Sequence, residues 1–143
     1  MIAEGPNAIV HDGTIYLIYS GSLVGIDYTT GLVTAPAGQD ADLTDPNVWT
    51  KLDYPLQKSG VYNEQWQLGT GHGMWSNDED GNLIYVFHNA EYENGRYGGR
   101  DAQVRRVHWS KEGMPILDMQ AAEELNPDYA DITMKIVVSG NKG

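Results

Sequence analysis

The chain has 143 residues, with 20 acidic against 9 basic side chains, a formal charge of −11 and no cysteine. This length fits one ordinary domain, and the absence of cysteine excludes disulfides, thiolate metal sites and thiol nucleophiles. The negative field repels phosphate backbones, so we expect no nucleic-acid partner, and apolar runs of strand length predict no membrane contact.

The first part of the chain predicts four β-strands. They span residues 7–10, 14–20, 28–34 and 48–52. The first two strands flank Asp12-Gly13, and Asp-Gly between β-rich runs is a strong hairpin signal because the turn requires positive φ. We therefore take residues 1–52 as one unit and expect a connection over 53–71.

A second unit follows over residues 72–118, with a similar layout. Its expected strands are 72–77, 83–89, 102–109 and 114–117. Asp80-Gly81 forms the turn between the first two strands. The remaining residues, 119–143, are expected to form a tail with a final strand at 132–138.

The two units are copies of one repeat. Gly81 and His72 each lie 68 residues after their counterparts, Gly13 and Glu4. Such a period, built from short strands, is typical of β-propeller blades, whose inner strands converge on a central pocket. A propeller needs about four to eight blades to close. The sequence therefore predicts an all-β fold of about two four-stranded blades in an incomplete ring, with Glu4 and His72 facing one pocket.

The aromatic composition fits two interpretations. The chain has 9 Tyr and 4 Trp but 1 Phe. Tyr and Trp combine an apolar face with a polar tip, which suits contact with sugars. The same residues also favour strands, so composition leaves the choice open.

A series of short motifs, in this order, resembles the last two blades of glycoside hydrolase family 43. The motifs are Glu4-Gly5-Pro6 with residues 16–20, then 69–74, 78–81, 85–88, 99–109 and 113–115. Members of that family are five-bladed propellers that remove arabinose or xylose units from plant polysaccharides. The sequence departs from the family pattern at Thr70, Gly73 and Met74, which puts the sugar specificity in doubt.

The resemblance implies an inverting glycosidase in which Glu4 is the general acid, Arg100 binds substrate and His72 lines the pocket. It also implies that His72 reaches a metal ion, calcium at the propeller axis, through water, and that no other cofactor is required. The family's catalytic base lies in earlier blades, so the isolated chain is expected to be inactive. Taken from the residues alone, the alternatives are that Glu4 is an exposed glutamate, that His72 is bonded to backbone carbonyls and that Arg100 is a surface arginine.

The sequence is also compatible with two other functions. The chain could be a non-catalytic carbohydrate-binding module, or a structural half-propeller. The expected partners are a carbohydrate substrate and an N-terminal propeller portion, in the same longer chain or in a separate one. The first residues lack the basic start and apolar core of a signal peptide. We expect a soluble protein, and the sequence does not decide between a cytoplasmic and a secreted location.

Overall fold

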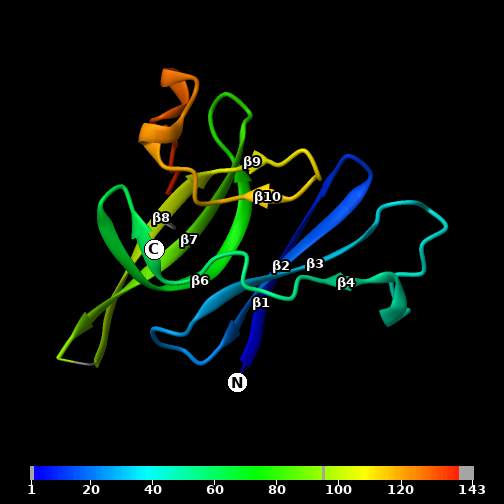
Figure 1. Cartoon of the computed structure of the whole chain (residues 1–143), viewed down its shortest axis with the longest axis horizontal. Helices are drawn as coiled ribbons and strands as arrows, with labels where there is room; N and C mark the ends of the chain where they lie inside the picture. The colour runs from blue at the N-terminus through cyan, green and yellow to red at the C-terminus, as the bar shows by residue number, and fades with distance from the viewer. Residues whose placement is uncertain (1, 95, 139–143) are drawn as a thin grey trace, which may run out of the picture.

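The computed structural model describes residues 2–94 and 96–138 as two twisted antiparallel sheets that pack together (Figure 1). The first sheet has the order β1-β2-β3-β4, so the four expected strands are present. Their bounds are β1 Ile2–His11, β2 Thr14–Ser22, β3 Thr29–Pro36 and β4 Thr50–Lys51. A 3₁₀ turn, η1 at Pro46–Val48, precedes β4.

The second sheet has the order β5-β6-β7-β8 and begins earlier than the sequence predicts. Its strands are β5 Gly60–Tyr62, β6 Gln65–Asn77, β7 Leu83–Glu93 and β8 Arg96–Arg106. β5 and the first half of β6 thus occupy the range 53–71 that was expected to be a connection. Asn63 and Glu64 both adopt positive φ, which closes a two-residue turn between these strands.

The fourth strand of the second unit is also arranged differently from the expectation. It is reduced to β10, Pro115–Ile116, which pairs with β9, His108–Trp109, in a separate two-stranded sheet. β9 follows β8 after a break at Val107, whose backbone N–H donates to the Leu83 carbonyl at 3.1 Å. The expected strands 102–109 and 114–117 therefore meet, but only over this short ladder.

The tail contains no strand in its described part, so the final strand expected at 132–138 is wrong. Instead two 3₁₀ turns, η2 at Ala121–Glu123 and η3 at Pro127–Tyr129, lie against the second sheet (Figure 1). The Arg106 guanidinium donates to the backbone carbonyls of Tyr129 and Asp131, each at 3.3 Å. Those carbonyls are thus satisfied by a side chain rather than by a neighbouring strand. No helix in the described part of the chain is long and apolar enough to cross a membrane.

One apolar core lies between the two sheets. Its buried members are Tyr16, Ile18 and Leu32 from the first sheet and Trp75, Tyr85, Phe87, Val107 and Leu117 from the second part of the chain. Asn7 Oδ1 on β1 also accepts a 2.8 Å hydrogen bond from the Trp75 backbone N–H on β6. The sheets are therefore fixed face to face by burial of apolar surface and by a bond between β1 and β6.

Candidate active site

The strands β1 and β6 are both irregular at equivalent points of the repeat. The pairing of β1 with β2 shifts register between Glu4 and Asn7, and the pairing of β6 with β7 shifts between Gly71 and Met74. Such bulges bend a strand and redirect its side chains. Here they bring Glu4 Oε1 to 3.8 Å from His72 Nδ1.

Gly5 allows this close approach. Its φ of 61° lies in the left-handed region, and a Cβ atom added there would lie 3.2 Å from His72 Nε2. Any larger residue would therefore be strained and would press against the imidazole. This accounts physically for the glycine that directly follows Glu4.

Tyr28 joins the two residues and was not anticipated from the sequence. Its hydroxyl donates a 2.7 Å hydrogen bond to Glu4 Oε1 and lies 3.1 Å from His72 Nδ1. Burial raises the pKa of Tyr28, and the nearby Glu4 carboxyl raises it further, so the phenol keeps its proton. Its position just before β3 gave only a strand signal, and nothing in the sequence indicated that its hydroxyl meets Glu4 and His72.

Gly71 makes room for the Tyr28 ring. A Cβ atom at position 71 would lie 2.6 Å from two ring carbons of Tyr28, which no real packing tolerates. The ring is 1% exposed, so only its hydroxyl end meets the polar cluster. The position of that hydroxyl is consequently set by the core.

The backbone of His72 is itself held in an unusual conformation. Its φ of 50° is rare for a residue other than glycine. The His72 N–H donates a 2.6 Å hydrogen bond to Ser20 Oγ, and Ser20 is the residue that pairs with Glu4 across β1 and β2. The same short segment of the first sheet therefore fixes both His72 and Glu4.

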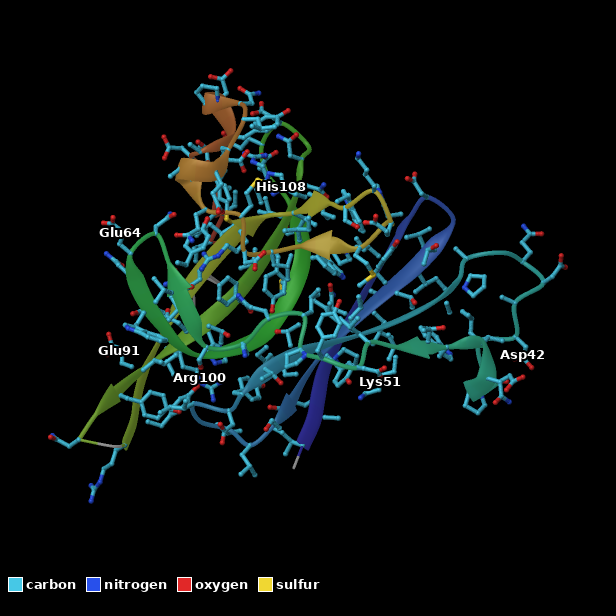
Figure 2. All side chains as sticks on the ribbon, viewed as in Figure 1. Asp42, Lys51, Glu64, Glu91, Arg100 and His108 are labelled. Carbon is cyan, nitrogen blue, oxygen red and sulfur yellow. The ribbon has the colours of Figure 1, made fainter. Side chains whose placement is uncertain are left out.

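Arg100 belongs to a layer next to this cluster. The rings of Tyr28 and His88 stack with centroids 5.7 Å apart, and His88 Nε2 lies 3.1 Å from the Tyr97 hydroxyl. The Arg100 guanidinium carbon is 4.9 Å from the centre of the Tyr97 ring. Figure 2 shows Arg100 on the second sheet, near the end of the loop that follows β2.

The charge of Arg100 shifts the pKa values of two neighbouring side chains, His88 and Tyr28. Burial lowers the pKa of His88 most, and the positive charge of Arg100 lowers it further. Arg100 also opposes the rise in the pKa of Tyr28. The predicted Arg100 is exposed, and its contacts run through Tyr97 and His88 to the Tyr28 ring rather than directly to Glu4.

The cluster is open on one side. The side chains of Glu4 and His72 are 44% and 50% exposed, although Tyr28 behind them is buried. A ligand entering from solvent would meet a carboxyl group, an imidazole and, one layer away, a guanidinium. These groups can exchange a proton with a ligand oxygen and form hydrogen bonds with hydroxyl groups.

The described residues do not supply a calcium site by themselves. No three or more His, Asp or Glu side chains of residues 2–94 and 96–138 gather where they could hold a metal ion. Calcium prefers six to eight oxygen ligands, and His72 offers one nitrogen. The expected contact of His72 with an ion through water therefore stays a prediction, and we assign no step to a metal.

The sequence profile of glycosyl hydrolases family 43 matches residues 1–115. The chain belongs to this family. It is 36% identical over 120 residues to alpha-L-arabinofuranosidase 43 of Humicola insolens, covering 80% of the chain and 24% of that relative. It is 31% identical over 134 residues to an extracellular exo-alpha-(1->5)-L-arabinofuranosidase of Streptomyces avermitilis, covering 88% of the chain and 27% of that protein.

The fold of this family 43 chain is likewise shared with a solved structure. An alpha-L-arabinofuranosidase from Lactobacillus brevis superposes with a TM-score of 0.70 at 30% identity, covering 80% of this chain and 36% of that one. The prediction of an all-β, incomplete propeller is confirmed. The chain spans about a quarter of the length of the two curated relatives, as their coverage of 24% and 27% shows.

Proposed function

We propose that this family 43 chain supplies the general-acid side of a glycosidase active site that acts on arabinose- or xylose-containing glycans. One observation carries the proposal: the Glu4 carboxyl is fixed 2.7 Å from the Tyr28 hydroxyl and 3.8 Å from His72, with its other side open to solvent. The names of the relatives, which are arabinofuranosidases, support the choice of sugar.

In an inverting reaction, Glu4 would protonate the oxygen of the leaving group while a carboxylate across the sugar activates water. The two carboxyl groups of such a pair stand about 6.5–9.5 Å apart. We place the base on propeller blades outside this chain, either in the same longer polypeptide or in a partner chain. The isolated chain is then expected to bind weakly and not to hydrolyse.

Arg100 is proposed to bind the sugar from the neighbouring layer. A guanidinium presents a planar set of N–H donors, which suits adjacent hydroxyl groups of a sugar. Its contact with Tyr97 leaves the group exposed and directed by an aromatic face. His72 would contribute an imidazole nitrogen to the substrate or to a water molecule beside it.

The proposal is tested with aryl arabinofuranosides and xylosides. The chain is assayed alone and after assembly with a propeller portion that carries the base. Turnover is expected only in the assembly, with a loss of about 10²–10⁴-fold in Glu4→Gln on substrates that need acid assistance. Full turnover in the Glu4→Gln assembly would contradict the role of Glu4. Binding of oligosaccharide without any turnover would instead identify a carbohydrate-binding module.

A further inference from the structure

We infer that Tyr28 is a positioning residue for the general acid. Its hydroxyl donates a hydrogen bond to Glu4 Oε1, so the proton that Glu4 transfers is held on Oε2. This inference rests on the proposed function of Glu4. Tyr28 is a buried residue, and it joins the site residues Glu4, His72 and Arg100 that the sequence predicts. Tyr28 does not touch the substrate in this arrangement and acts through Glu4.

The hydrogens of the cluster can be followed one by one. Tyr28 has a single O–H, which donates to Glu4 Oε1 at 2.7 Å. His72 Nδ1, 3.1 Å from the same phenolic oxygen, can bond to it only by carrying a hydrogen of its own. The network therefore runs from His72 Nδ1–H to the Tyr28 oxygen and from the Tyr28 O–H to Glu4, leaving His72 Nε2 with its lone pair.

This order of hydrogens suits proton donation. While Glu4 is protonated, its Oε1 is the acceptor oxygen and its O–H is on Oε2, away from Tyr28. When Oε2 gives its proton to the leaving oxygen, the bond from Tyr28 becomes charge-assisted and shortens. Tyr28 thereby favours the carboxylate that the reaction produces without itself losing a proton.

The hydroxyl of Tyr28 is held rigidly. The ring is 1% exposed, stacks on His88 and lies against Gly71, where no Cβ could fit. Glu4, by contrast, is near the start of β1 and its side chain is 44% exposed. A fixed phenol thus orients a carboxyl group that would otherwise sample several rotamers.

The test compares two aryl glycosides in the assembled enzyme, one with a poor leaving group and one with a leaving group that departs without protonation. Tyr28→Phe removes one oxygen and is expected to lower kcat about 10- to 100-fold on the first substrate and less than about twofold on the second. The matched control is Tyr85→Phe, which removes a buried hydroxyl bonded to Thr30 Oγ at 2.6 Å in the same core. Tyr85→Phe should lower the free energy of unfolding, but any change in kcat should be the same for both substrates.

The outcomes separate this inference from the proposed function. An equal fold-loss of kcat on both substrates in Tyr28→Phe would overturn the role of Tyr28 alone, provided that the loss in Glu4→Gln still depends on the leaving group. A Glu4→Gln variant without that dependence would overturn the role of Glu4. If Tyr28→Phe does not fold, ¹⁵N NMR of the unmodified chain decides, with His72→Gln used for assignment. The neutral His72 imidazole is expected to carry its hydrogen on Nδ1, and a hydrogen on Nε2 instead would overturn the network.

Discussion

Asn7 Oδ1 accepts a 2.8 Å hydrogen bond from the backbone N–H of Trp75, its counterpart 68 residues later in the repeat. The bond joins β1 to β6 directly beside the bulges that direct Glu4 and His72. The two inner strands of the blades are thus connected by residues that the repeat itself makes equivalent.

Asn7→Ala should destabilise the protein. The substitution leaves the Trp75 N–H without its acceptor in a partly buried position, which costs about 1–3 kcal/mol in the free energy of unfolding. Urea unfolding measures this change. Asn47→Ala, an exposed asparagine bonded to Asp45, serves as the control and should change stability by less than about 0.5 kcal/mol. Equal effects in both variants would contradict a special role for Asn7.

Gly71→Ala should disturb both stability and the site. The new methyl group would lie 2.6 Å from the Tyr28 ring, so the ring must move and its hydroxyl must leave Glu4. Overpacking of this kind costs about 1–3 kcal/mol. Gly38→Ala is the control, because a Cβ there meets no atom within 4 Å. Thermal unfolding of the two variants, with turnover in the assembly, is the measurement, and a neutral Gly71→Ala would refute the close contact.

Acid should weaken the link between the second sheet and the tail. Burial alone would raise the pKa of Asp78, but hydrogen bonds from Asn82 and the charge of Arg106 outweigh it and lower this pKa. A carboxyl group with a lowered folded-state pKa stabilises the protein above the unfolded-state pKa, and the stability is lost as the pH falls through the folded-state value. The loss should therefore begin at about pH 4.

Denaturant unfolding at several acidic pH values checks this expectation. Asp78→Asn should be less stable at neutral pH, because it leaves Arg106 without its 3.0 Å ion pair, and should lose less stability on acidification. Glu79→Gln, an exposed neighbour in the same turn, should keep the pH dependence of the unaltered protein. An unchanged acid dependence in Asp78→Asn would show that other carboxylates are responsible.

Removal of the Arg100 charge should raise the pKa of His88. Burial remains the main cause of the lowered pKa, so Arg100→Gln is expected to recover only part of the difference from an ordinary histidine. NMR titration of the His88 ring measures it directly. Arg96→Gln removes an exposed charge from the same hairpin and should leave His88 unaltered. A His88 titration that is identical in Arg100→Gln would place Arg100 outside the layer.

Local sequence signals predicted the parts of the fold that depend on local chemistry. Asp12-Gly13 and Asp80-Gly81 announce hairpins because glycine accepts positive φ, and both glycines have it in the structure. The turn between β5 and β6 uses Asn63 and Glu64 at positive φ, and a glutamate at such a position gives no recognisable signal. For this reason β5 and half of β6 were missed.

In the site, too, some residues could be predicted from the sequence and others could not. The repeat placed Glu4 and His72 at equivalent positions, and the structure brings them within 3.8 Å. Tyr28 could not be found from the repeat, because it precedes β3 and its hydroxyl meets Glu4 on β1 only through the way its ring packs against Gly71. The layer that leads to Arg100 likewise depends on side-chain stacking across β7 and β8.

The left-handed backbone of His72 sets the stability of the fold against the pocket role that we propose for its side chain. Glycine would adopt its φ of 50° without the penalty of about 1–2 kcal/mol that other residues incur. A library randomised at position 72 and selected only for heat resistance should therefore converge on glycine. The same library selected for sugar release from a polymer should retain histidine. The two selections should therefore favour different residues at position 72.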